Sequence, residues 1–273
     1  MPQDLYIVHN AFSLLLSLSL ISVRSNHFGT VVIAHKKAKS IAESIQKDLK
    51  LYNVKIVPFQ NTAPPLKIIS SKYNCVFVSN PWHKRIIPFY ITLKRAGTLH
   101  LIDDGFATIN EDYKAAIQKD LSFFASTALR IANKNISFDT HFTIFKNPSP
   151  SYLETHKYNK RIDIKPEALH NIFPPCAPED NNNKDIVIIL GSTYIPAQKI
   201  KTHLYPNNHH SLRILLKDHP NLINGIDEIG CPPEIFILKN LHSIKTLHHC
   251  KSSTAYFSNY LFPEIKTEEY FNA

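Results

Sequence analysis

Short runs of β-branched and aliphatic residues recur along this chain at intervals that suit alternating strands and helices. In the first part of the chain they occur at Leu5–Val8, Thr30–Ala34, Asn53–Pro58, Cys75–Ser79 and Thr98–Ile102. Helical patterns separate them, at Ala11–Val23, Ala38–Tyr52 and His83–Ala96. Strands that alternate with helices pack as a parallel sheet covered on both faces and joined by right-handed crossovers. The spacing therefore predicts an α/β, Rossmann-like domain.

A second series of such runs follows a stretch rich in proline. Prolines and asparagines gather between residues 146 and 184, a composition typical of a linker. Beyond it, strands are predicted at Asp185–Leu190, Leu212–Leu216 and Glu234–Leu238, and helices at Pro196–Leu204 and Leu241–His249. The pattern predicts an N-terminal Rossmann-like domain over residues 1–160, a linker over 161–184 and a C-terminal Rossmann-like domain over 185–273.

Charge and cysteine content narrow the classes of partner. The chain carries 31 Lys and Arg against 22 Asp and Glu, a net charge of +9, which favours an anionic partner. No basic helix, aromatic RNA-binding motif or zinc module is visible, so a nucleic-acid partner is not expected. The 4 cysteines include no C-x-x-C pair, as is typical of a reducing compartment. The apolar run Ala11–Val23 is too short to span a bilayer, and no signal peptide is expected.

The stretch Leu99–Gly105 is the main candidate for a functional site. Its apolar residues lead directly into Asp103 and Asp104, and Gly105 follows. A buried strand that ends in carboxylates presents them at the carboxyl edge of a parallel sheet, where open α/β folds bind ligands. His9-Asn10 follows the first predicted strand and would lie at the same edge. An ordinary turn or helix cap is the alternative interpretation of the acidic pair.

Two more short motifs follow in the second half of the chain. His219-Pro220 comes after a predicted strand, and Ser252-Ser253 comes near the end. In this order the three motifs resemble the acidic-acidic-Gly, His-Pro and Ser-Ser/Thr motifs of bacterial sialyltransferases of glycosyltransferase family 52 and of the related polysialyltransferases. The resemblance implies the GT-B fold, in which two Rossmann-like domains face a central cleft.

The resemblance also implies a role for each matched residue. Asp104 would be the general base that takes the proton of the acceptor hydroxyl, supported by Asp103. His219 would face the phosphate of the departing CMP and protonate it. Ser252 and Ser253 would donate hydrogen bonds to that phosphate. A turn histidine and a serine helix cap are the alternative interpretations of the last two motifs.

Further substrate-binding residues are expected beside these. Gly105 and Gly191 would let a ligand approach the backbone closely, and Ser192 follows Gly191 at the end of a predicted strand. Pro220 would fix the backbone behind the histidine. Glu234 matches a glutamate that holds the cytidine ribose in enzymes of this resemblance.

The function implied is an inverting transfer of sialic acid from CMP-sialic acid to a hydroxyl of a bacterial surface glycan, with lipooligosaccharide galactose as the first candidate. No metal and no further cofactor are expected, and the partners would be CMP-sialic acid and a glycan or glycolipid acceptor. The expected location is the cytoplasm, with lysine-rich segments able to contact an anionic inner membrane. A second copy of the chain, in a homodimer, is a further candidate partner. A capsule polysialyltransferase, a nucleic-acid-binding protein and a degenerate, non-enzymatic nucleotide-binding protein are the alternatives.

Overall fold

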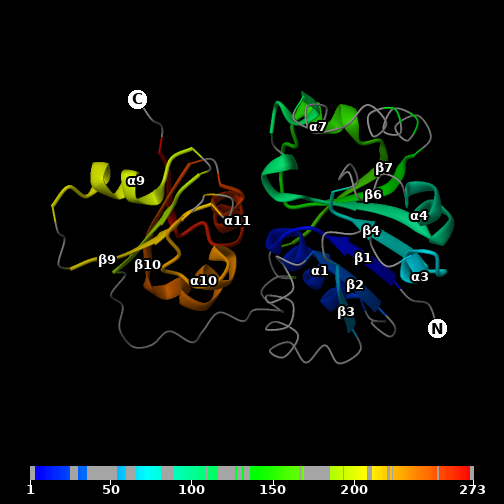
Figure 1. Ribbon diagram of the computed structural model, residues 1–273, viewed down its shortest axis with the longest axis horizontal. Helices are drawn as coiled ribbons and strands as arrows, with labels where there is room; N and C mark the ends of the chain where they lie inside the picture. Colours follow the sequence, from blue (N-terminus) through cyan, green and yellow to red (C-terminus); the bar gives the residue numbers. More distant parts are fainter. Residues whose placement is uncertain are drawn as a thin grey trace. The chain divides into compact units, whose positions relative to one another are not determined.

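The computed structural model describes residues 4–24, 30–35, 54–59, 66–80, 89–108, 110–115, 127, 131, 136–165, 168, 185–192, 194–207, 211–219, 222, 224–250 and 252–270. The chain divides into two compact units, Met1–Ile172 and Phe173–Ala273 (Figure 1). This boundary falls inside the segment predicted as a linker, and the first residues of that segment, up to Asp163, belong to the last strand of the first unit.

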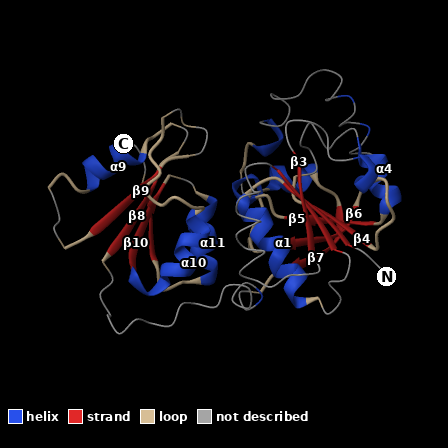
Figure 2. Cartoon of the chain, turned by 60° about the horizontal axis from the view of Figure 1, so that its bottom comes forward, coloured by secondary structure: helices blue, strands red, loops and turns tan. Residues whose placement is uncertain are grey.

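The first unit is built on a parallel sheet of seven strands in the order β3-β2-β1-β4-β5-β6-β7. Its strands are β1 (Asp4–Val8), β2 (Thr30–His35), β3 (Val54–Phe59), β4 (Cys75–Val78), β5 (Thr98–Ile102), β6 (Phe138–Thr143) and β7 (Tyr158–Asp163). Its described helices are α1 (Ala11–Val23), α3 (Leu66–Ile69), α4 (Tyr90–Ala96), α7 (Pro150–Thr155) and the short 3₁₀ helix η2 (Gly105–Thr108). Figure 2 shows α1 and α4 flanking the strands on opposite sides.

Helix α1 is buried from Phe12 to Ile21, which explains why its sequence is apolar on every side. Its buried serines have hydrogen-bond partners, because their hydroxyls donate to carbonyls of the preceding turn. Ser17 Oγ donates to Ser13 O at 2.8 Å, and Ser19 Oγ donates to Leu16 O at 2.7 Å. Asn10 caps the helix, accepting from the Ser13 backbone N–H at 2.8 Å. The N-terminus of α1 is thus fixed directly behind the end of β1.

The strand order of the first unit reverses between β1 and β4. From β1 the chain proceeds outward to β2 and β3, and then returns to the other side of β1 to add β4, β5, β6 and β7. Such a reversal leaves a crevice outside the carboxyl ends of the two central strands, where ligands bind in open α/β sheets. The loops that follow β1 and β4 therefore define the expected binding edge.

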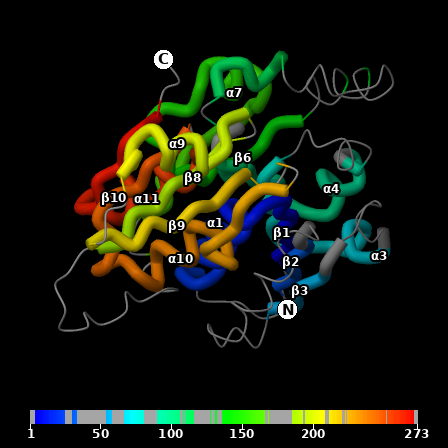
Figure 3. Tube along the Cα trace, turned by 60° about the vertical axis from the view of Figure 1, so that its left-hand side comes forward, coloured from blue at the N-terminus to red at the C-terminus, as the bar shows by residue number. Residues whose placement is uncertain are grey.

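The second unit repeats this plan on a smaller scale (Figure 3). Its parallel sheet has the order β11-β10-β8-β9, with strands β8 (Ile186–Leu190), β9 (Arg213–Lys217), β10 (Ile244–His249) and β11 (Lys266–Glu269). Its helices are α9 (Ala197–Leu204), α10 (Pro233–Asn240), the 3₁₀ helix η3 (Leu241–Ser243) and α11 (Ser253–Leu261). Figure 1 shows α9 on one side of the sheet and α10 and α11 on the other. The order reverses between β8 and β10.

The α/β class with parallel sheets is confirmed, but two predicted elements of the second unit are wrong. Glu234–Leu238 is not a strand but part of α10, and Leu241–His249 is not a helix but η3 followed by β10. Prolines at 232 and 233 start α10, since proline suits the first turn of a helix. β10 is a strand because it pairs with β8 on one side and β11 on the other, and short apolar runs alone do not distinguish the two states.

Three strands, β6, β7 and β11, were not predicted. The predicted helix Ala38–Tyr52 lies outside the described residues, as does the beginning of His83–Ala96, whose end forms α4. Within the described part of the chain, no helix has the length and apolar character needed to cross a membrane.

Candidate functional site

Three adjacent strands of the first sheet end in polar residues at one edge. His9-Asn10 follows β1, Ser79-Asn80 follows β4 and Asp103-Asp104 follows β5, and these strands are neighbours in the order β1-β4-β5. His9 Nδ1 lies 3.4 Å from Ser79 Oγ, so the loops after β1 and β4 meet across the point where the strand order reverses. This edge is the candidate site of the first unit.

Asp104 is held at this edge by one side chain from each neighbouring loop. Asn10 Nδ2 donates to Asp104 Oδ1 at 2.8 Å, and Asn80 Nδ2 donates to Asp104 Oδ2 at 2.7 Å. The Asp104 backbone N–H donates to Thr108 Oγ1 at 3.2 Å, which closes the turn that follows the strand. Asp104 as a whole residue is 9% exposed. Asp104 therefore has a fixed orientation at the edge without any cation among these contacts.

Burial raises the pKa of Asp104 from its ordinary value of 3.8 to about 7. The hydrogen bonds from Asn80 and Asn10 act in the opposite direction because they stabilise the charged form, and the charge of Asp103 adds to the increase. A carboxyl group that titrates near neutral pH is a stronger base than an ordinary aspartate and is still ionised in part at pH 7. These properties suit proton abstraction.

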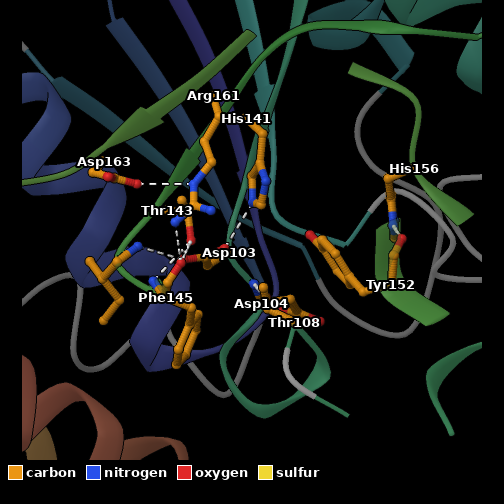
Figure 4. Close-up of polar contacts among 11 residues, drawn as sticks. Asp103, Asp104, Thr108, His141, Thr143, Phe145, Tyr152, His156, Arg161 and Asp163 are labelled. Carbon is orange, nitrogen blue, oxygen red and sulfur yellow. Dashed lines mark hydrogen bonds and ion pairs between the residues drawn. The ribbon is translucent and has the colours of Figure 1, made fainter. Parts of the chain in front are cut away.

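Asp103 has a different position from Asp104, as Figure 4 shows. Its side chain is fully buried, with Oδ1 2.9 Å from His141 Nε2 and Oδ2 accepting from the Ile144 backbone N–H at 2.8 Å. Both contacts come from β6 or from the residue after it, so Asp103 ties the end of β5 to the end of β6. It supports the loop that carries Asp104 and is not placed to touch a substrate.

Gly105 has a conformational reason for being glycine. Its φ is +69°, in the left-handed region that side chains disfavour, and it begins η2. This turn brings Thr108 back to the Asp104 backbone. A role for Gly105 in substrate binding stays a prediction.

The second sheet also gathers several predicted residues at its carboxyl edge. Gly191-Ser192 follows β8, His219 lies two residues after β9, and Ser252-Ser253 leads from β10 into α11. These three strands are neighbours in the order β10-β8-β9. His219 is exposed, and its carbonyl accepts from the Leu222 N–H at 2.8 Å. Pro220 lies outside the described residues.

Gly191 is explained by a neighbouring aspartate rather than by a nucleotide. Asp218 Oδ1 accepts from the Ala197 N–H at 2.6 Å, at the N-terminus of α9, and Oδ2 accepts from the Ile226 N–H at 2.8 Å. A Cβ on Gly191 would lie 2.3 Å from Asp218 Oδ1. The close approach expected for a ligand at Gly191 is therefore made by Asp218, whose negative charge already occupies the helix N-terminus.

Ser192 makes three hydrogen bonds with the backbone of Tyr194 and Ile195. Ser192 Oγ accepts from the backbone N–H groups of Tyr194 at 3.2 Å and Ile195 at 3.0 Å, and the Ser192 N–H donates to Ile195 O at 2.8 Å. The Tyr194 side chain is 92% exposed at the tip of this turn. A rigid turn that presents an aromatic ring to solvent lies at the reversal of the second sheet.

Glu234 and the serine motif lie together, although Glu234 starts a helix and not a strand. Glu234 is buried in the first turn of α10, and its Oε1 accepts from Thr254 Oγ1 at 2.7 Å. Burial raises the pKa of Glu234. Ser252 caps α11, with Oγ accepting from the Thr254 N–H at 3.2 Å, and the Ser252 N–H points to His249 Nδ1 at 3.4 Å. Ser253 is the first residue of that helix.

Sequence reasoning missed Asn80, Asp218 and His141. A signal existed for the first two, because each comes within two residues of a strand end, as Asp104 does. His141 lies inside β6, which was not predicted. Among the residues that the structure describes, no group of three or more His, Cys, Asp and Glu side chains is placed to hold a metal ion.

Comparison with known proteins gives only remote similarities. No family model and no curated protein matches this sequence. The structure of Arabidopsis thaliana UGT89C1 complexed with UDP-L-rhamnose matches with a TM-score of 0.47 and 12% identity over 98% of this chain and 85% of that chain. The same protein complexed with UDP gives a TM-score of 0.45 and 13% identity over 91% and 75%. The N-terminal domain of Candida albicans trehalose-6-phosphate phosphatase gives 0.38 and 7% over 100% and 73%. TM-scores in this range assign neither a family nor an activity.

Proposed function

We propose that this chain is a nucleotide-sugar-dependent glycosyltransferase in which Asp104 is the general base, with CMP-sialic acid as the donor. The observation that carries the proposal is a buried carboxylate, with a pKa of about 7, that follows β5 and is held by side chains from the two loops beside the reversal of strand order. The order of the acidic, His-Pro and Ser-Ser motifs, which resembles that of bacterial sialyltransferases, supports the choice of donor.

The reaction needs one base and one stabilised leaving group. The acceptor oxygen forms a bond to the anomeric carbon while the bond from that carbon to the CMP phosphate oxygen breaks, and CMP departs with the electron pair. The hydroxyl proton passes to Asp104 as its oxygen attacks. Attack from the face opposite CMP inverts the anomeric centre.

The edge of the second sheet offers groups suited to the nucleotide. The exposed His219 can donate to a phosphate oxygen, and Ser252 and Ser253 lie at the N-terminus of α11, a favourable place for negative charge. The N-terminus of α9 already holds Asp218, so α11 is the better of the two for a phosphate. Glu234, beside the serines, would accept a hydrogen bond from a ribose hydroxyl.

Asp104→Asn is the sharpest test of the base, because the fold can accommodate it. Asn10 must keep its oxygen toward the Ser13 N–H, so its amide still donates to the oxygen of the new side chain. Asn80 can turn its amide over to accept from the new NH₂ group. We expect transfer from CMP-sialic acid to fall by about 10² to 10⁴-fold, measured as CMP release with a lactose-type acceptor. Asp112→Asn, on an exposed turn, is the matched control.

Substantial transfer by Asp104→Asn, or equal loss in the control, would remove Asp104 from the reaction. The donor is tested separately by thermal shift with CMP, CDP, UDP and GDP. CMP should raise the melting temperature most, since a ligand of the native state stabilises it by mass action, and a preference for UDP would overturn the choice of donor. A panel of lactose-type ends and sialic acid oligomers then distinguishes a lipooligosaccharide acceptor from a capsule acceptor.

A further inference from the structure

Asp104 accepts hydrogen bonds from two asparagines, and the orientation of one of them is determined by the fold. Asn10 Oδ1 accepts from the Ser13 N–H at 2.8 Å as the cap of α1. The other end of the same amide, Nδ2, must therefore face Asp104 Oδ1. The amide group of Asn10 therefore connects the N-terminus of α1, which carries a partial positive charge, to the Asp104 carboxylate.

Asn80 binds the other oxygen of the Asp104 carboxylate. It follows β4, the strand between β1 and β5, and its Nδ2 donates to the second carboxylate oxygen at 2.7 Å. Each oxygen of Asp104 thus accepts one amide hydrogen and retains one lone pair. Neither asparagine titrates, so both stabilise the negative charge without a cation that would make Asp104 a weak base.

We propose that Asn10 and Asn80 form an amide clamp, a pair of positioning residues that favours the ionised form of the Asp104 carboxyl group and holds it in a single orientation at the edge of the sheet. The role in catalysis rests on the proposed function, but the clamp itself concerns only these three side chains. It explains why an asparagine stands two residues after the end of β1 and two residues after the end of β4.

The other titratable groups around Asp104 do not replace this clamp. Asp103 is adjacent in the sequence, and its charge disfavours ionisation of Asp104. Tyr113 and Tyr152 are buried within range of the Asp104 charge, and burial raises the pKa of each phenol well above its ordinary value, so they stay neutral. His9 lies on the same loop as Asn10 and contacts Ser79. The hydrogen bonds from the two amides lower the pKa of Asp104.

The test separates the clamp from the helix cap. Asn10→Ser keeps a good N-cap residue but removes the amide donor, and Asn80→Ala removes the other donor. Asn240→Ala is the matched control, because that amide donates to a backbone carbonyl of the second unit at 2.8 Å. The full chain is labelled with carboxyl-¹³C aspartate, the Asp104 signal is assigned by its loss in Asp104→Asn, and its pKa is read from a pH titration.

We expect Asn10→Ser and Asn80→Ala each to raise the pKa of Asp104 by about one pH unit, since each removes a hydrogen bond to the charged form. The control should leave it unchanged. An Asp104 pKa that does not move in either variant overturns the clamp, whatever the activity. In the transfer assay, the acid limb of the pH profile should move upward by the same amount, with the rate recovering at high pH.

The two proposals fail in different ways. If the carboxyl pKa moves but the wild-type chain transfers no sugar, the clamp stands and the proposed function is wrong. If the chain transfers sugar but the acid limb of its pH–rate profile does not move with the Asp104 pKa in the variants, the clamp again stands and Asp104 is not the base.

Discussion

At the edge of the first sheet Asp104 receives its two carboxylate hydrogen bonds from asparagine side chains, whereas at the edge of the second sheet Asp218 receives both from backbone N–H groups. The sheets share a parallel arrangement and a reversal of strand order. The backbone donors belong to Ala197, at the start of α9, and to Ile226, so Asp218 links these two segments of the second unit. Each oxygen of either carboxylate accepts one of these hydrogen bonds, so the difference lies in the donors: Asp104 is held by two side chains that single substitutions can remove. The donors of the two buried acids thus show which one can be released from its contacts by changing a single side chain.

Removing the charge of Asp104 should have the largest effect on stability, and the effect should depend on pH. The pKa of Asp104 is raised in the folded state to about 7 from 3.8. The folded state is therefore most favoured below pH 4 and loses stability as the pH rises through 7. At pH 8 to 9, Asp104→Asn should be more stable than the wild type by up to about 4 kcal/mol, and near pH 4 the two should be similar. Urea denaturation at both pH values measures this, and a difference independent of pH would contradict it.

A methyl group at position 191 tests the importance of the Asp218 contacts for the stability of the second unit. In Gly191→Ala the new Cβ would collide with Asp218 Oδ1, which two backbone donors hold in place. We expect a loss of about 3 kcal/mol, the upper range for overpacking, seen as faster hydrogen exchange of β8 amides. Lys199→Ala, at an exposed position of α9, is the control. If the β8 amides of Gly191→Ala exchange as slowly as those of the wild type, Asp218 can move away from the new methyl group.

Acid should destabilise the first unit through a buried histidine. Burial lowers the pKa of His156 to about 3, while its ordinary value is 6.5. The unfolded chain therefore binds a proton that the folded chain does not, and stability falls as the pH drops below 6.5. Between pH 6.5 and 5 this histidine should account for about 2 kcal/mol. His156→Asn, which keeps a donor toward the Tyr152 carbonyl, should lose less stability over that range in urea denaturation.

The smallest effect is expected at the exposed turn of the second sheet. Tyr194→Ala should leave the melting temperature unchanged because the ring is 92% exposed. If the ring stacks on the nucleobase, CMP affinity should fall by up to about tenfold, the range for one aromatic contact, measured by calorimetry. Tyr256→Ala, on α11, is a comparison. Equal CMP affinity in Tyr194→Ala and wild type would exclude the turn from the nucleotide site.

The sequence predicted the apolar strands well and the more polar ones poorly. β1, β5 and β8 are apolar and almost wholly buried, so their composition alone marks them as strands. β7 (Tyr158–Asp163) and β11 (Lys266–Glu269) carry mostly polar residues because they lie at sheet edges. Their strand conformation depends on pairing with a neighbour, which local composition does not reveal.

The candidate site was predictable only in part for a similar reason. Asp104 was found because it directly follows a clear strand. Asn80 was not, because its importance depends on β4 lying between β1 and β5, and spacing along the chain does not give that order. The separate positions of Asp103 and Asp104 also depend on contacts with β6. The GT-B arrangement of the two units, with a central cleft, stays a prediction.

Because Asn10 caps a helix embedded in the core, the Asp104 carboxylate takes its position in part from the buried helix α1. Conservative substitutions far along α1, at residues such as Leu18, would then change the position of Asp104 by moving the helix. A slight tilt of the helix would displace the aspartate before it disturbed the fold. Loss of turnover in a normally folded variant would be the first sign of such damage.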